Sequence, residues 1–203
     1  MQSVKLANKE LIGIVETFIN KLLLIERSKF PFHKADIEAD YACGEQYLLS
    51  MQSKKVDGFP EKTFGIDLMK WIPPTMSQTL TTLDHDLLAW SGCRNNAVKM
   101  FYPKGGYMGW HHNANAPGYN ILLSWSKEGK GYFRYQDPVT KEIVTMPDTP
   151  GWTCKVGYYG PWHEKDKIYW HCANAKEEER FTLGYIIPHQ GMWENMIEDI
   201  ETA

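Results

Sequence analysis

Apolar residues recur at helical spacing in the first half of the chain. The clearest pattern covers residues 8–27, where Asn8 is a suitable N-cap and the apolar positions are Leu11, Ile12, Val15, Phe18, Ile19, Leu22 and Leu23. Weaker helical patterns cover residues 35–53 and 77–90, and Gly92 is placed to end the second of them. We therefore expect residues 1–95 to form a helical layer that packs on a flat surface.

The pattern changes after residue 95, where short apolar or aromatic runs alternate with turn signals. Many of these signals contain Gly or Pro, as in Lys104-Gly105-Gly106 and Asp137-Pro138. This pattern predicts strands near residues 97–101, 106–112, 119–126, 131–135, 142–145, 152–159, 168–172 and 180–187. Regularly spaced short strands are typical of a sandwich or barrel. We expect the β-core over 96–188, followed by a C-terminal tail over 189–203 with a short helix.

Composition narrows the class of protein. The 203 residues are 43% hydrophobic and 23% charged, which is ordinary for one soluble domain, and we predict a single domain over 1–203. The net charge is −3 and there is no long basic run, so the sequence carries no strong nucleic-acid signature. The longest aliphatic run, Leu22 to Ile25, is too short to cross a bilayer. We predict a cytoplasmic protein without a membrane partner.

The cysteines fit that compartment. They are scattered, with neither a C-x-x-C pair nor the spacing of a disulfide framework, at Cys43, Cys93, Cys154 and Cys172. We expect them to be reduced thiols.

Two histidines on separate predicted strands are candidate metal ligands. Residues i and i+2 of a strand point to one face, so His111 and Asn113 are expected to project together. His171 follows sixty residues later on another predicted strand. Two histidines with one oxygen ligand, leaving other positions open, is the arrangement of non-haem Fe(II) oxygenases.

An arginine and a threonine follow at a spacing that fits a co-substrate. Arg180 lies nine residues after His171, and Thr182 shares its strand face. A guanidinium offers a planar fork of donors that suits a carboxylate. The pair is therefore a candidate anchor for one end of a dicarboxylic acid whose other end binds the metal.

Taken together, these motifs resemble those of the 2-oxoglutarate and Fe(II)-dependent oxygenase superfamily, in its prolyl-hydroxylase-like branch. The likeness covers residues 100–187 and also extends to small bacteriophage-encoded members. It rests on the run from Tyr102 to Asn113, on Phe133-Arg134-Tyr135-Gln136-Asp137-Pro138, on Trp170-His171-Cys172 and on Arg180 to Tyr185.

The resemblance implies a double-stranded β-helix, or jelly roll, with flanking helices. It also implies a dioxygenase that uses Fe(II), 2-oxoglutarate and dioxygen, and that forms succinate while it oxidises a substrate. By the same resemblance, His111, Asn113 and His171 are the metal ligands, and Arg180 and Thr182 bind the co-substrate. The substrate stays open among a small metabolite, a protein side chain and a nucleobase.

One position departs from the family pattern, so alternative metal ligands and alternative functions stay open. The family motif is His-x-Asp or His-x-Glu, whereas Asn113 offers a neutral amide oxygen. If His112 faced the metal instead, its i+2 partner would be Ala114, as in the carboxylate-free site of the family's halogenases. Asp137 or Asp148 could also supply a carboxylate from another strand. A last alternative is a degenerate barrel that binds a metal or a partner without turnover.

Overall fold

Two antiparallel sheets form the centre of the protein in the computed structural model, which describes residues 1–33, 35–54, 56–92 and 96–203. The six-stranded sheet, here called sheet A, has the strand order β1-β9-β6-β11-β4-β3. The five-stranded sheet, sheet B, has the order β2-β5-β10-β7-β8. The strands are β1 (Gln2–Val4), β2 (Thr63–Phe64), β3 (Ile66–Asp67), β4 (Asn96–Tyr102), β5 (Tyr107–His111), β6 (Gly118–Ser126), β7 (Tyr132–Gln136), β8 (Ile143–Pro147), β9 (Gly151–Tyr159), β10 (Trp170–Asn174) and β11 (Arg180–Ile187).

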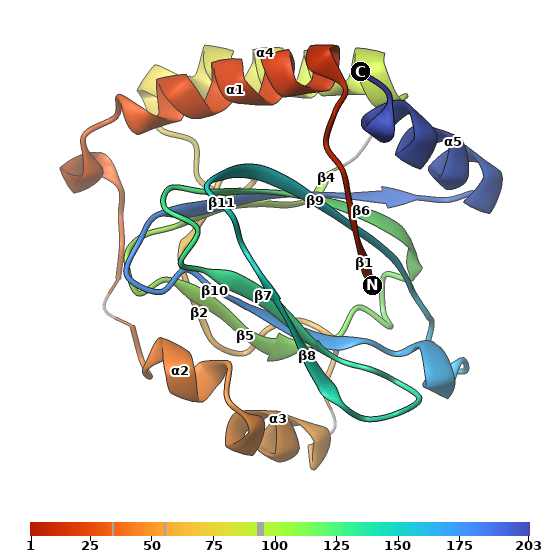
Figure 1. Cartoon of the computed structure of the whole chain (residues 1–203). Coiled ribbons are helices and arrows are strands. Elements are labelled where there is room, and N and C mark those ends of the chain that lie inside the picture. Colours follow the sequence, from red (N-terminus) through yellow and green to blue (C-terminus); the bar gives the residue numbers. More distant parts are fainter. Residues whose placement is uncertain (34, 55, 93–95) are drawn as a thin grey trace.

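From β4 onwards the chain passes back and forth between the two sheets. Strands β4, β6, β9 and β11 lie in sheet A, and β5, β7, β8 and β10 lie in sheet B. The two sheets face one another, as Figure 1 shows. Leu122 of β6 clusters with Phe133 and Tyr135 of β7, so side chains of the two sheets meet in the space between them. This inter-sheet space holds the polar residues considered below.

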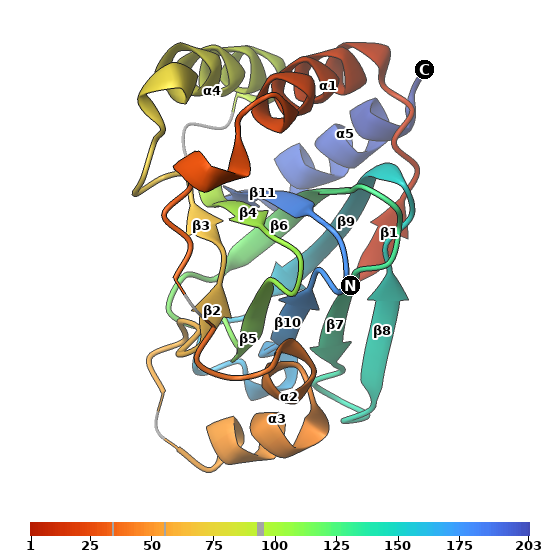
Figure 2. The same ribbon diagram turned by 90° about the vertical axis from the view of Figure 1, so that its left-hand side faces the viewer.

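Helices cover the outer faces of both sheets. The α-helices are α1 (Lys9–Leu23), α2 (Ala39–Ala42), α3 (Glu45–Gln52), α4 (Ser77–Ser91) and α5 (Gln190–Glu201), with 3₁₀ turns at Arg27–Lys29, Pro74–Met76 and Lys165–Lys167. Helices α1, α4 and α5 lie over sheet A, whereas α2 and α3 lie beneath sheet B (Figures 1 and 2). The larger hydrophobic core therefore lies between sheet A and the three longer helices.

Helix α1 shows how the sequence produces this arrangement. The side chain of Asn8 accepts a hydrogen bond from the backbone N–H of Leu11 at 2.9 Å and begins the helix. The apolar face is buried, and the ring of Phe18 lies 5.0 Å from that of Phe181 on β11. Burial of a side chain such as Phe18 stabilises the fold by about 1.5–3 kcal/mol. Gly92 ends helix α4, as its position in the sequence predicts, with a positive φ of 67°.

The predicted class, mainly β with flanking helices, is confirmed. Each strand predicted after residue 95 is present, with ends that differ by one or two residues. The helical pattern over 35–53 is two short helices, because the chain leaves helical geometry at Cys43 and Gly44. Strands β1, β2 and β3 are too short to be read from alternation, and they come from the segment predicted as a helical layer.

Two smaller expectations concern thiols and membranes. Cys43, Cys154 and Cys172 are buried free thiols, while Cys93 lies outside the described residues. In the part of the chain that the structure describes, each helix is too short or too polar to span a bilayer. The division into domains and the cellular compartment stay predictions.

Candidate functional site

His111 and His171 lie opposite one another on adjacent strands. His111 is the last residue of β5, and it is the register partner of His171 on β10. A β-bulge in β5 shifts the register between this pair and the next one, Ala173 with Met108. The imidazole ring centroids are 4.1 Å apart, and both side chains are buried. We call these two residues the histidine pair.

Backbone carbonyls fix which nitrogen of each ring can bind a ligand. Nδ1 of His111 lies 2.9 Å from the carbonyl oxygen of Gly109, and Nδ1 of His171 lies 2.9 Å from that of Tyr169. A carbonyl only accepts, so each Nδ1 carries the proton, and Nε2 of the neutral ring keeps its lone pair. Metal-ligating histidines are usually oriented in this way, by a hydrogen bond from the ring nitrogen that does not bind the metal.

Burial keeps both rings neutral. It lowers the pKa of His111 to about 4, although the bond to Gly109 acts in the opposite direction. Burial, together with the neighbouring His111, lowers the pKa of His171 well below its usual value. Both rings are therefore unprotonated at neutral pH, which is the state that can bind a metal.

Aromatic rings enclose His171. Tyr159 of β9 stacks on it with ring centroids 4.9 Å apart and planes at 8°, and Phe133 of β7 lies at 5.6 Å. Tyr159 thus brings sheet A against the histidine pair. Its buried hydroxyl has no hydrogen-bond partner among the described residues. Tyr159 is not among the site residues predicted from the sequence, because its position facing His171 depends on how the strands pair.

His112 lies away from the histidine pair. Its ring makes edge contacts with Trp162 at 4.5 Å and with Trp170 at 4.6 Å. Trp170 precedes His171 on β10, and neighbouring residues of a strand point to opposite faces. Nδ1 of His112 accepts the backbone N–H of Ala114 at 3.3 Å. His111, and not His112, is therefore the residue that meets His171.

The candidate oxygen ligands lie in different parts of the structure. Asn113 lies two residues after the end of β5 and is half-buried, and its backbone carbonyl accepts the N–H of Ala116. Asp137 lies in the β7–β8 turn, where its carboxylate accepts the N–H groups of Val139 and Thr140. Within the described ranges, no group of three or more His, Cys, Asp or Glu side chains could hold a metal ion. A carboxylate therefore does not accompany the histidine pair there.

Arg180 and Thr182 lie together in the inter-sheet space. Nη1 of Arg180 donates to the hydroxyl of Thr182 at 2.5 Å, and Nη2 donates to that of Ser124 at 3.1 Å. Arg180 is only 1% exposed, and it lies over the ring of Tyr102. The guanidinium thus points its two terminal nitrogens towards a pair of hydroxyls.

Asp148 pairs with Arg180 rather than with a metal site. Its Oδ2 lies 2.7 Å from Nε of Arg180, and its Oδ1 lies 3.1 Å from Nζ of Lys155. Burial raises the pKa of Asp148, but the two cations outweigh burial and the pKa is lowered overall. We call Asp148, Lys155 and Arg180 the charge cluster. Asp148 was a possible metal ligand from the sequence, whereas Lys155 was not among the predicted site residues.

The chain has remote likenesses among solved structures. No family model and no curated protein matches the chain. A prolyl-4-hydroxylase from Pseudomonas putida is 13% identical, with a TM-score of 0.42, over 91% of this chain and 90% of that one. A Trichoplax adhaerens prolyl hydroxylase, solved with a hypoxia inducible factor peptide fragment, is 11% identical, with a TM-score of 0.36, over 97% and 98% of the two chains.

Likenesses at these identities and TM-scores do not establish what this chain does. They also leave the resemblance to bacteriophage-encoded members a prediction. The case for a function therefore rests on this chain's own residues.

Proposed function

We propose that the protein is a non-haem Fe(II) and 2-oxoglutarate-dependent dioxygenase that oxidises an unidentified substrate. The observation that carries the proposal is the histidine pair, with each Nδ1 bound to a carbonyl and each Nε2 keeping its lone pair. Metal–nitrogen bonds are about 2 Å long, so two imidazoles on one ion lie close together, and the rings of the histidine pair are already neighbours. The pair therefore fits a resident metal ion.

The strand order supports the same proposal. Four strands of sheet A run β9-β6-β11-β4, and four of sheet B run β5-β10-β7-β8, with the chain alternating between the sheets. That is the order of a double-stranded β-helix, the jelly roll that the sequence resemblance implies. We accordingly interpret β4 to β11 as a jelly roll, with β1, β2 and β3 as additions to its sheets.

Separate residues of the chain would bind the metal and the co-substrate. His111 and His171 hold Fe(II), with the amide oxygen of Asn113 or a water as a further ligand. In proteins of this class, bound Fe(II) supplies the chemistry by which dioxygen and 2-oxoglutarate become succinate, carbon dioxide and one hydroxyl group on the substrate. Phe133 and Tyr159 pack around His171 and keep bulk water from this side of the pair.

Arg180 and Thr182 would bind the distal carboxylate of 2-oxoglutarate. Asp148 occupies the edge of the guanidinium formed by Nε and Nη2, so the edge formed by Nη1 and Nη2 faces Thr182 and Ser124. These bonds leave at least one N–H of Arg180, and a carboxylate can accept it together with the hydroxyl proton of Thr182. Asp148, which neutralises the charge of Arg180, thus also orients its guanidinium group.

A second candidate function follows from the absence of an acidic ligand. No Asp or Glu joins the histidine pair within the described residues, and this favours a metal site without a carboxylate. Such a site could take a halide, as in the family's halogenases, or bind a metal without turnover. In either case His111 rather than His112 would bind the metal, because His112 packs between two tryptophans.

Succinate formation tests the proposal. The protein is loaded with Fe(II) without oxygen, mixed with 2-oxoglutarate and air, and succinate is measured. We expect Arg180→Ala to raise the 2-oxoglutarate concentration needed about tenfold or more while Mn(II) affinity stays nearly unchanged, because Arg180 acts on the co-substrate. Arg134→Ala is the matched control, since Arg134 lies on the outward side of β7 and bonds Thr145 and the carbonyl of Cys43.

The outcomes separate the candidates. Succinate formed without chloride supports the dioxygenase, and a chloride requirement with a chlorinated product supports the halogenase. Tight metal binding with no succinate under either condition supports a barrel without turnover. If Arg180→Ala abolishes metal binding as well, Arg180 is structural and its assigned role is wrong.

A further inference from the structure

Three hydroxyl groups form a row across sheet A. Thr182 of β11 is the register partner of Ser124 on β6, and Ser124 is the partner of Thr153 on β9. Register partners on neighbouring strands project to the same face of a sheet. The three hydroxyls therefore lie side by side on the face that turns towards sheet B, where Thr182 and Ser124 bind Arg180.

A cation lies at each end of this row. Arg180 donates to Thr182 and Ser124 at one end, and Nζ of Lys155 donates to the hydroxyl of Thr153 at 3.1 Å at the other. Lys155 is only 2% exposed, although it lies on β9 between the apolar Cys154 and Val156. Asp148 bonds both cations and so joins the two ends.

Direct contacts supply one negative charge for two positive charges. Asp148 contacts both cations, and the other carboxylate near Arg180, Glu178, bonds elsewhere. The carboxylate of Glu178 accepts the hydroxyl of Ser126 and backbone N–H groups of the β6–β7 turn, at Glu128, Lys130 and Gly131. Buried charges are costly unless they are paired, so the cluster has a place for one more anion.

Arg180 and Lys155 have further N–H groups that could donate hydrogen bonds to such an anion. A guanidinium has five N–H groups and an ammonium has three. The bonds to Asp148, Thr182 and Ser124 use at most four from Arg180, and those to Asp148 and Thr153 use two from Lys155. Burial, aided by Arg180, also lowers the pKa of Lys155 in spite of Asp148. An added carboxylate would favour its charged form.

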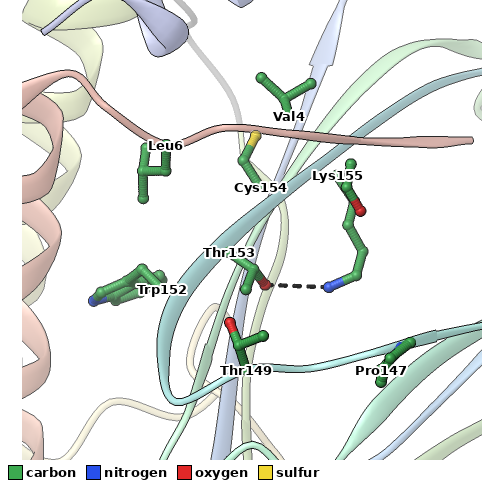
Figure 3. Close-up of a pocket in the computed structure, with 9 residues that line it drawn as sticks. Val4, Leu6, Pro147, Thr149, Trp152, Thr153, Cys154 and Lys155 are labelled. Carbon is green, nitrogen blue, oxygen red and sulfur yellow. Dashed lines mark hydrogen bonds between the residues drawn. The ribbon is translucent and has the colours of Figure 1, made fainter.

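There is space beside Lys155. A cavity of about 270 Å³ lies at the β1 edge of sheet A. It is lined by residues of β1 and the segment after it, by Pro147 at the end of β8, by Thr149, and by the β9 residues Trp152, Thr153, Cys154 and Lys155. Figure 3 shows the side chain of Lys155 reaching Thr153, with the hydrogen bond dashed. The cavity therefore adjoins the two β9 residues that form this bond.

We infer that Lys155 is a second carboxylate-binding cation of the co-substrate site, and that the distal carboxylate binds along the hydroxyl row between Arg180 and Lys155. Asp148 is the positioning residue that holds the two cations apart and in place. This inference rests on the proposed function. It adds a specificity rule: the site selects a 2-oxo acid with a second carboxylate and discriminates strongly against one that ends in a methyl group.

Equilibrium binding tests this without turnover. The protein is saturated with Mn(II), and 2-oxoglutarate or 2-oxovalerate, the acid of equal chain length that ends in a methyl group, is titrated in by calorimetry. We expect Lys155→Met to weaken 2-oxoglutarate binding about tenfold or more, the effect of losing a bond between charged groups. Binding of 2-oxovalerate and of Mn(II) is expected to change by less than about twofold, and Lys155→Arg to restore most of the loss.

Lys99→Met is the matched control. Lys99 is also buried in sheet A and pairs with one aspartate, Asp84, at 2.5 Å, but its register partner Leu183 belongs to the core on the helix side. We expect this variant to bind both acids as the wild type does. If Lys155→Met does not fold, Lys155→Gln gives the same comparison, since it keeps a donor for Asp148 and removes the charge.

Two results would overturn the role of Lys155 while the proposed function stands. One is unchanged 2-oxoglutarate affinity in Lys155→Met. The other is an equal loss for both acids, which marks a structural lysine. A wild-type protein that binds neither acid in the presence of Mn(II) contradicts the proposed function itself, and this inference with it.

Discussion

The histidine pair and the charge cluster occupy the same inter-sheet space but satisfy their polar groups in opposite ways. Each histidine has its Nδ1 bound to a backbone carbonyl two residues earlier in the chain, and its Nε2 keeps a lone pair. Arg180 and Lys155 instead bond side chains from β6, β9, β11 and the β8–β9 turn. The bonds of the histidine pair orient each ring and leave Nε2 available, whereas the bonds of the charge cluster connect several strands. We therefore expect changes in the histidine pair to affect mainly ligand binding, and changes in the charge cluster to affect both ligand binding and stability.

The largest expected effect is on stability. Asp148→Ala removes the carboxylate that Arg180 and Lys155 share, and leaves two buried cations without it. We expect the free energy of unfolding to fall by about 3–5 kcal/mol, measured by urea denaturation. In Asp84→Ala, the control, the lost carboxylate is half-exposed and water can replace it, so the loss is about 1 kcal/mol or less. Equal losses would mean that the charge cluster has no special part in the fold.

The histidine pair is expected to respond in metal affinity instead. His171→Ala removes one of the two nitrogen ligands and should weaken Mn(II) binding roughly a hundredfold or more. Even the loss of a group that only hydrogen-bonds a metal ligand costs about ten- to a hundredfold in metal affinity. Equilibrium titration measures this, and urea denaturation of the metal-free protein should show a smaller change than for Asp148→Ala. His85→Ala, which removes a histidine exposed on α4, should bind Mn(II) as the wild type does. Unchanged affinity in His171→Ala would remove the basis of the proposed function.

A carboxylate beside the histidine pair should strengthen metal binding. Asn113→Asp adds a negative charge two residues after His111, and we expect Mn(II) affinity to rise about tenfold if this side chain faces the metal. Asn115→Asp adds the same charge at an exposed position of the same turn and should change affinity little. Equal changes in the two variants would indicate a general charge effect and argue against Asn113 as a ligand.

The smallest expected effect is a pH dependence that belongs to the charge cluster. Arg180 and Lys155 outweigh burial and hold the pKa of Asp148 below its unfolded value of about 4. Its contribution to stability is thus complete above that value and is lost as pH falls through the lower folded pKa. Between pH 6 and pH 3 the wild type should lose more stability than Asp148→Asn, as urea midpoints would show. Parallel losses would place the acid sensitivity in other carboxylates.

Much of the fold could be predicted from the sequence because its signals are local. Helix α1 has a cap and an apolar stripe, and the strands after residue 95 are separated by turn residues. Strand pairing is not local. His111 and His171 could be chosen as candidates from their motifs, but their register, and the exclusion of His112, depend on which strands become neighbours.

The charge cluster is harder to predict from the sequence than the histidine pair. Asp148 belongs to a run, Asp148-Thr149-Pro150-Gly151, that indicates an exposed turn, yet its side chain is buried. Lys155 lies between Cys154 and Val156, and a lysine on a strand is usually solvent-exposed. A lysine alternating with buried apolar residues was a usable signal, but its partner could be identified only once the β8–β9 turn was placed.

The bulge in β5 has a consequence for how this chain can change over time. In β5, three steps from Met108 to His111 oppose the two steps from Ala173 to His171 on β10. Insertion of one residue between Met108 and Trp110 would therefore put an indole where an imidazole stands, while the β6–β9 ladder runs without a shift. Among homologues, single-residue insertions should be missing from this short segment even where loops vary freely in length. A tally of such gaps gives a record, independent of any assay, of whether the histidine pair has been kept by selection.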